Sequence, residues 1–318
     1  MRIIPTIAYE NHLGYIVPLN YGYAAGHPGG LPVPMEVGTL LLENDLLNYD
    51  WSLETADSPD GYGGRVIGFR RGVTMKKVPV QIWTRTNVQY VGGLFNGEEI
   101  YKGNVYLLQK IFDADIIAKK PGKLYVGDWW VKAYVVASEK TEWNDDLPYM
   151  INTLTFAIES AYWNMEEWFN FPAYETMGGS GFRYPGKYPA KYCMTGGVKY
   201  IRPWLYDRES PMVITVYGPA QNPAFTIAGN VYTVLTEITE GERLVIDQLE
   251  RTVHKITATG DVVNEFNNRG KESSVFEPIP AGYWEIPVYY SGNFAFEVKL
   301  YTQVTEPILQ ESGESGLL

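Results

Sequence analysis

Short runs of alternating apolar and polar residues, separated by turn-forming residues, fill the C-terminal part of the chain from Gly218 to Tyr301. No segment of this run has the 3.6-residue apolar period of an amphipathic helix. Asn222-Pro223 and Gly229-Asn230 supply turn chemistry, because Pro presets φ and both Gly and Asn tolerate positive φ. Strands this short and regularly spaced predict a β-sandwich, in which two packed sheets bury their apolar faces.

One hairpin within this run is clearly punctuated. Thr259-Gly260-Asp261 separates two strand-like segments, which is the arrangement of a tight turn between paired strands. We expect His254 to lie on the first of these strands as an ordinary packed or solvent-facing side chain. The residues expected on the inner sheet faces, or next to them, are Thr226, Val231, Leu244, Ile246 and Val253.

A second alternating pattern begins at Asn48 and predicts a separate set of strands interrupted by one helix. In the helix, Tyr101, Val105, Leu108 and Phe112 recur at spacings of four, three and four residues, which places them on one face. We expect Lys102, Gln109 and Asp113 to point away from that face, and Asn104 is a possible N-cap. The predicted strands cover residues 49–55, 64–72, 76–86, 124–126, 129–138 and 149–163.

The remaining segments are rich in Gly, Pro and Tyr and lack a period. Residues 1 to about 38 are predicted to form an arm or extended loops, wrapped on their own domain or packed against a neighbouring copy. Residues 164–200 are predicted to form a connector that contains the domain boundary. The expected fold is mainly β, with two β-sandwich-like domains over residues 1–165 and 166–318, the first with one α-helix; the polar C-terminal tail is expected to be disordered.

Charge and composition exclude several classes of partner. The chain of 318 residues has a formal net charge of -11, which opposes binding to phosphate backbones, and we find no basic stripe that would override it. No apolar stretch approaches the length of a membrane span, and the first residues lack the pattern of a secretory signal. The single cysteine, Cys193, excludes an intramolecular disulfide and a cysteine-built metal site. We therefore expect a soluble protein without membrane insertion or specific nucleic-acid binding.

Residue types that carry catalysis are present but not arranged for it. His12, His27 and His254 are far apart, with no second ligand at metal-binding spacing, and Gly178–Gly181 lacks the Lys, strand and helix of a phosphate loop. The acidic clusters fall at predicted turns, where carboxylates stay solvated, although two carboxylates in a β-sandwich are also the signature of a glycoside hydrolase. We therefore expect no enzyme activity, catalytic residue, cofactor or metal. The clusters are Glu139, Glu142, Asp145 and Asp146, and Glu237, Glu240 and Glu242.

The ordered motifs of both halves resemble those of siphophage distal tail proteins, which are hub proteins at the tip of a non-contractile tail. In the first half, the matching segments are IFDADI, PGKLYVGD and the closing aromatic-Trp pair. The C-terminal run matches through a GE-to-ID strand, a hairpin and a late Gly-containing strand. The matching C-terminal positions are Gly241, Glu242, Leu244, Ile246, Asp247, Thr252, Val253, Gly260, Asn264, Phe266, Phe276, Gly282 and Ile286.

The resemblance implies a structural virion protein, assembled in the host cytoplasm and located at the tail tip. It implies a homo-oligomer, namely a hexameric ring, single or as two stacked rings, closed by the N-terminal domains. The implied partners are the tail tube protein, a tail-tip protein, and receptor-binding or fibre proteins. DNA could pass through the ring, because a like-charged wall does not hold it.

The alternative is a carbohydrate-binding sandwich that acts directly in host attachment. The family's C-terminal domain resembles galectin-like sandwiches, which bind sugars through an exposed Trp with polar neighbours. Trp204 and Trp284 are the candidates among the 9 Trp and 25 Tyr of the chain. Trp284 alternates with Ile286 and Val288, so we expect it in the core rather than on the surface.

Overall fold

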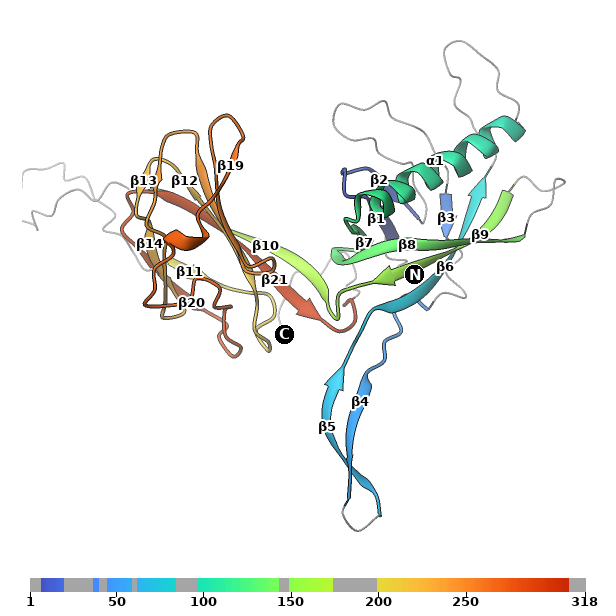
Figure 1. Cartoon of the computed structure of the whole chain (residues 1–318), viewed down its shortest axis with the longest axis horizontal. Helices are drawn as coiled ribbons and strands as arrows, with labels where there is room; N and C mark the ends of the chain where they lie inside the picture. The colour runs from blue at the N-terminus through green and yellow to red at the C-terminus, as the bar shows by residue number, and fades with distance from the viewer. Residues whose placement is uncertain are drawn as a thin grey trace, which may run out of the picture. The chain divides into compact units, whose positions relative to one another are not determined.

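The computed structural model describes residues 7–19, 37–39, 45–58, 62–83, 97–142, 149–173 and 199–308. The chain forms two compact units, unit 1 (Met1–Asn164 with Val304–Leu318) and unit 2 (Met165–Gln303). It passes between them inside strand β10 (Trp163–Phe171) and at the end of strand β21 (Ala295–Val304). Both units consist mainly of antiparallel strands, which confirms the predicted fold class (Figure 1).

Unit 1 is built on one antiparallel sheet. Its strands are β1 (Ile7–Glu10), β2 (Ile16–Pro18), β3 (Val37–Thr39), β6 (Thr74–Trp83), β7 (Gly122–Val126), β8 (Trp129–Glu142) and β9 (Tyr149–Ile158). They follow the order β2-β1-β7-β8-β9-β6-β3. The alternation of Val78, Val80 and Ile82 is confirmed, because all three side chains are fully buried. A one-residue slip in this strand would turn these side chains to the other face.

The first strands correct the prediction of loops over residues 1 to about 38. β1 pairs with β2 and also with β7, so residues 7–18 belong to the sheet of their own unit. Tyr9 and Val17 are fully buried. The prediction missed these strands because each is only four or three residues long, which is too short for a period to be recognised.

Helix α1 (Gly97–Ala118) contacts β6 and β8. Leu108 and Phe112 are buried whereas Gln109 and Asp113 are exposed, as the periodicity predicts. The side chains of Tyr101, Lys102 and Asn104 lie outside the described residues. The ring of Tyr9, on β1, lies 5.4 Å from that of Phe112 and 5.7 Å from that of Phe156 on β9, so one aromatic cluster joins helix and sheet. None of the described helices combines the length and apolarity of a membrane span.

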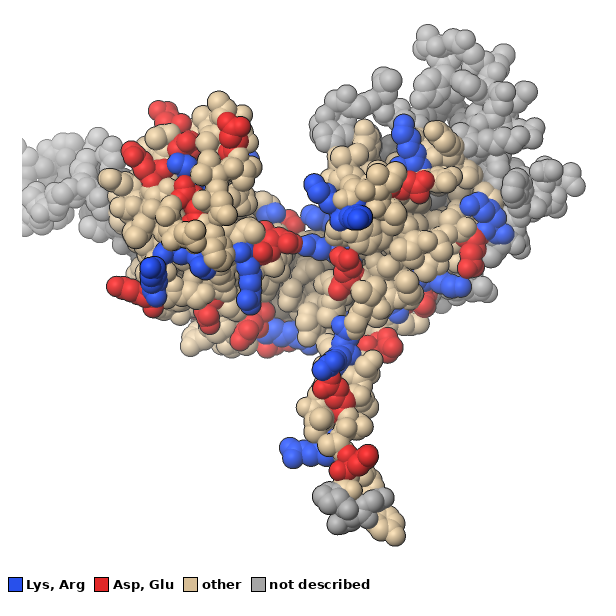
Figure 2. Space-filling view, in the orientation of Figure 1, with Lys and Arg blue, Asp and Glu red and all other residues tan. Residues whose placement is uncertain are grey.

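A two-stranded ribbon extends away from this sheet (Figure 1), and Figure 2 shows both basic and acidic side chains along it. It consists of β4 (Ser52–Asp57) and β5 (Gly64–Arg70), which form a sheet of their own. At its root, the ring of Trp51 lies 6.2 Å from that of Tyr162. The Arg71 guanidinium donates a hydrogen bond of 2.7 Å from Nη1 to the carbonyl oxygen of Ala161. The root of the ribbon is therefore fastened to the segment between β9 and β10.

Unit 2 is a β-sandwich. One sheet has the order β19-β18-β17-β12-β21-β10, the other has the order β11-β20-β14-β15, and β13 pairs with β16. Their inner faces form one core, in which Phe296 stacks on Phe225 and Phe171 at 4.7 Å and 4.6 Å between ring centroids. The remaining elements are β11 (Lys199–Ile201), β12 (Met212–Tyr217), β13 (Ala220–Gln221), β14 (Ala224–Ile227), β15 (Asn230–Thr233), β16 (Glu237–Ile238), β17 (Arg243–Asp247), β18 (Thr252–Ile256), β19 (Val262–Asn264), the 3₁₀ turn Phe266–Asn268 and β20 (Ile286–Tyr290).

Most of the C-terminal prediction is confirmed. Leu244, Ile246 and Val253 are buried, and β18 pairs with β19 around the predicted turn. Thr226 and Val231 are directly paired, but they lie on the outward face, with Val231 43% exposed. In β14 and β15 the residues that point into the core are Phe225, Ile227 and Tyr232. Thr226 and Val231 lie between these positions along the strands, and therefore point outward.

The predicted connector over residues 164–200 is also partly wrong. Residues 163–171 form strand β10, with Trp163 and Phe171 buried at its two ends. Charged residues occupy its middle, where Glu166 forms an ion pair with Lys299 and Glu167 accepts a hydrogen bond from Thr302. Because charged residues occupy its middle, this strand lacks the apolar alternation by which a strand is predicted from sequence. Residues 174–198 lie outside the described part of the chain.

Gly122 allows β1 to approach β7 closely. A Cβ at this position would lie 2.5 Å from the Glu10 carbonyl oxygen and 2.5 Å from the Tyr9 hydroxyl oxygen. We expect Gly122→Ala to lower the free energy of unfolding of unit 1 by about 1 to 3 kcal/mol, because either the Glu10 backbone or the Tyr9 ring must shift. The control is Gly72→Ala, whose Cβ would meet nothing within 4 Å. Equal unfolding midpoints in urea for both variants would contradict this account.

Candidate functional site

A buried cluster of catalytic residue types lies at the junction of β1 and α1. The Asp115 side chain on α1 has no exposed surface. Its Oδ2 accepts a 2.5 Å hydrogen bond from the Tyr9 hydroxyl. Its Oδ1 lies 2.8 Å from the His12 backbone nitrogen and 2.5 Å from His12 Nδ1. The carboxylate oxygens of Asp115 therefore bind Tyr9 on β1 and His12 in the turn after it.

The neighbouring Asn11 strengthens the same junction. Its side-chain oxygen accepts hydrogen bonds of 3.0 Å from the backbone nitrogens of Leu13 and Tyr15, which shapes the turn between β1 and β2. Its side-chain nitrogen donates to the Ile111 carbonyl oxygen on α1 at 3.3 Å. The turn is thus fastened to the helix through side chains at two successive positions, Asn11 and His12.

This cluster is arranged for structure rather than for catalysis. Burial, together with the hydrogen bond to the Asp115 carboxylate, raises the pKa of the Tyr9 hydroxyl, so Tyr9 serves as a hydrogen-bond donor. A catalytic dyad needs a nucleophile or substrate site beside the His. The Asp115 carboxylate on Nδ1 is also how a catalytic Asp holds its His, but among the described residues His12 makes no hydrogen bond to a Ser, Thr or Cys side chain, and Tyr9 and Asp115 are fully buried. The sequence pattern does not predict this cluster, because His12 and Asp115 are 103 residues apart. The available signal was Asp115 itself, three residues after Phe112 on the buried side of the helix.

The predicted acidic clusters do not form paired active-site carboxyls among the described residues. Glu139 is exposed and lies 3.8 Å from Lys77. Glu237 and Glu240 are exposed, and the Thr239 backbone N–H, donating to Glu242, holds the pKa of that carboxyl below its usual range. A general acid would require the opposite shift. The side chains of Glu142, Asp145 and Asp146 lie outside the described residues.

The other candidates for metal or phosphate binding give no site in the part of the chain that the structure describes. His254 lies on β18 and is half-buried, as predicted. His27, Gly178–Gly181 and Cys193 fall outside the described residues. Within the described ranges, no group of three or more metal-ligating side chains comes together.

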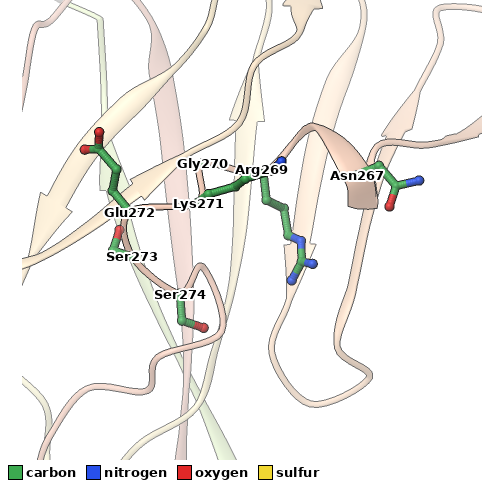
Figure 3. A pocket seen from close by; sticks show the side chains of 7 residues that line it. All are labelled: Asn267, Arg269, Gly270, Lys271, Glu272, Ser273 and Ser274. Carbon is green, nitrogen blue, oxygen red and sulfur yellow. The ribbon is translucent and has the colours of Figure 1, made fainter.

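A shallow hollow of about 710 Å³ lies over the loop from Asn267 to Ser274 (Figure 3). Arg269 stacks over the Phe266 ring at 3.7 Å and donates from Nε to the Phe266 carbonyl oxygen at 2.6 Å. Figure 3 shows Glu272 pointing away from Arg269. Ligand recognition requires polar side chains that converge on one point, and the polar side chains of this hollow do not converge.

Exposed aromatic side chains gather where β11 ends and β20 begins. Trp284 is 62% exposed and lies in the bend before β20, so the prediction that it belongs to the core is wrong. The alternation that buries Ile286 and Val288 does not extend to this residue, because the strand starts only at Ile286. The opposite loop carries Trp204, which is 39% exposed.

These two loops are joined by polar contacts. The Arg202 guanidinium donates to Glu285 Oε1 at 3.0 Å from Nε and 2.6 Å from Nη2. The Gly282 backbone N–H donates to the Tyr206 carbonyl oxygen at 2.6 Å. We call this surface the aromatic loops; its exposed rings are Trp204, Tyr206, Tyr283 and Trp284.

Comparison with known proteins gives structural similarity only. No protein-family model and no curated protein matches the chain. The chain is similar to a protein of the phage P2 baseplate in its activated conformation, in structures with Ca and with Sr, at 16% and 15% identity and a TM-score of 0.56 in both; each match covers 96% of this chain and 100% of the other. It is also similar to the SPP1 Dit protein, described as a paradigm of the hub adsorption apparatus in phages that infect Gram-positive bacteria, at 8% identity and a TM-score of 0.52, over 95% of this chain and 100% of the other. The resemblance to tail hub proteins is therefore confirmed at the level of the fold.

The Asp115 cluster gives a direct test of the structural interpretation. Asp115→Ala leaves buried donors on Tyr9 and His12 without the carboxylate, so we expect unit 1 to lose about 3 kcal/mol of unfolding free energy. Asp113→Asn, at an exposed position of the same helix, should change it by less than about 0.5 kcal/mol. Urea titrations followed by tryptophan fluorescence measure both. A fully stable Asp115→Ala protein would contradict the structural role.

Proposed function

We propose that this chain is a structural virion protein that forms the hub at the distal end of a phage tail. The observation that carries the proposal is the agreement in fold with phage baseplate and hub proteins over 95% to 96% of the chain, which includes both units. A fold alone hosts many functions. The contacts of Tyr9, His12 and Asp115 support a structural role rather than an enzymatic one, since they connect β1 to α1.

In this role the chain forms a hexameric ring, single or stacked in pairs, that joins the tail tube to the tip or baseplate. Unit 1 closes the ring, and unit 2 carries receptor-binding or fibre proteins. The ring is coaxial with the tube, and the net charge of -11 suits a lumen through which DNA slides without being held. The protein is assembled in the host cytoplasm, resides at the tail tip of the virion, and catalyses no reaction.

The ring is the directly testable part. We expect purified protein, alone or mixed with its tube and tip partners, to have a native mass of about six or twelve protomers, because identical subunits with complementary patches close into a ring. Native mass spectrometry gives the mass, and negative-stain imaging shows the central hole. A strictly monomeric protein at high micromolar concentration, with and without those partners, would overturn the hub assignment.

A second candidate function is carbohydrate binding by unit 2, which the exposure of Trp284 favours. Exposed Trp and Tyr rings offer apolar faces for stacking, and the Arg202–Glu285 pair beside them offers polar groups. In this case unit 2 contacts the cell surface directly.

Glycan-array screening followed by NMR titration tests this candidate. We expect any saturable glycan binding to weaken at least about tenfold in Trp284→Ala, since truncating a central aromatic residue of a binding site typically costs more than 1 kcal/mol. Trp168→Ala is the matched control, because Trp168 is also exposed, at 53%, but lies on β10 beneath the Lys299 ammonium. No saturable binding, or equal loss in both variants, would remove the candidate.

A further inference from the structure

One sheet of unit 2 carries no charged residue at the outward positions of its strands. Its register pairs Tyr200 on β11 with Pro287 on β20, and it pairs Thr226 on β14 with both Tyr289 on β20 and Val231 on β15. These residues alternate along their strands with residues that are buried in the core, so their side chains point outward. We call the surface that they form the tyrosine face.

This face is unusual for the surface of a sandwich in water. Tyr200 is 44% exposed, Tyr289 52% and Val231 43%. The remaining outward pair, Ala224 with Thr233, is uncharged as well. The outward face of the other sheet, by contrast, carries Arg243, Asp247, Glu297 and Lys299. An outward sheet face is normally polar, and a contiguous exposed apolar surface marks a site of interaction.

The tyrosine face adjoins the aromatic loops. The last pair of the ladder between β11 and β20 is Ile201 with Ile286, and the next residues beyond it are Arg202 and Glu285. Because the Arg202 guanidinium donates two hydrogen bonds to the Glu285 carboxylate, the two charges neutralise each other. Trp284, which is 62% exposed, comes directly before Glu285. Exposed rings therefore extend from the aromatic loops onto the sheet, with a neutralised ion pair between them.

We propose that the tyrosine face and the aromatic loops together bind a neutral polysaccharide chain. The inference rests on the carbohydrate-binding candidate above, and it adds Tyr200, Thr226 and Tyr289 to the site. A sugar ring has an apolar C–H face, which stacks on an aromatic ring, and hydroxyl groups, which form hydrogen bonds with the hydroxyls of Tyr and Thr. The tyrosine face offers both kinds of group side by side.

The charges of this surface select against an ionised ligand. A carboxylate, phosphate or ammonium group that is removed from water needs a charge of opposite sign. The outward positions of the tyrosine face provide none, and the adjoining Arg202 and Glu285 already bind each other. Outward rings and hydroxyls instead match an uncharged chain. Acidic glycans and strongly charged peptides are therefore poor ligands for this surface.

The shape of the surface favours the interior of a chain over one terminal sugar. The row from Tyr289 through Thr226 to Val231 crosses three neighbouring strands, which lie about 4.8 Å apart, and the adjoining Trp rings extend it. A small ligand is normally held in a concave site that buries most of its surface. Paired strands offer a flat and rigid support instead, along which successive sugars can lie.

A matched pair of substitutions tests this surface. Thr226→Arg places a long cation at the centre of the tyrosine face, where Thr226 is half-buried between Tyr289 and Val231. Thr215→Arg is the control, because Thr215 is also half-buried at the centre of an outward face, that of the other sheet. Tyr289→Ala removes one ring without adding a charge, and it serves if Thr226→Arg folds poorly.

The probes are neutral and uronic-acid-containing polysaccharides on one array, followed by calorimetric titration of the full chain with the neutral polysaccharide that it retains best. We expect the wild type to retain neutral rather than acidic polysaccharides. Thr226→Arg and Tyr289→Ala should raise the dissociation constant at least about tenfold, whereas Thr215→Arg should leave it unchanged. Circular dichroism verifies the fold of each variant.

The other outcomes overturn the inference at different points. Loss of binding in Trp284→Ala but not in Thr226→Arg or Tyr289→Ala confines the glycan to the aromatic loops, so the carbohydrate-binding candidate stands and the tyrosine face fails. Preference for acidic polysaccharides, or equal loss in Thr215→Arg, also overturns the inference. No retention of any polysaccharide removes both the candidate and the inference, and it leaves the hub assignment in place. If Thr226→Arg then loses a purified fibre or tip protein, the face belongs to a protein partner.

Discussion

The attachment of α1 to the first strand is the constraint on which unit 1 depends. A fully buried carboxylate is unfavourable unless it is hydrogen-bonded, and Asp115 meets this condition through Tyr9 and His12. β1 is also paired with β7, where Gly122 leaves room for the Tyr9 hydroxyl. One side chain on the helix therefore connects the helix to the first strand and to the turn after it.

This attachment also determines what unit 1 presents to its surroundings. Because the turn after β1 is fastened to α1, Leu13 and Tyr15 stay on the surface beside the end of the helix. The ribbon is presented in a similar way, since its root is fixed and its apolar side chains remain exposed. Exposed apolar groups on fixed supports are typical of protein interfaces, in which little ordering entropy is lost on binding.

Unit 2 follows a different principle. Its core is a stack of aromatic rings around Phe296 between two sheets. Its candidate binding surface is the aromatic loops at one end of the sandwich. Such a sandwich tolerates changes in its loops, because the core does not depend on them. The aromatic loops, held by the Arg202–Glu285 pair, can therefore bind a different partner from the one that unit 1 binds.

The sequence alone determined the class of fold, the pairing of the C-terminal hairpin and the buried face of the helix, because local period and turn chemistry dictate these features. The same reasoning failed for Trp284, since alternation does not reveal where a strand begins, and for β10, whose paired charges hide its pattern. Only the tertiary structure brought His12 to Asp115 and placed Leu53 beside Phe69 on an uncovered face. Local sequence patterns predict neither contacts between distant residues nor which strand faces stay exposed. Both depend on how the elements pack in space.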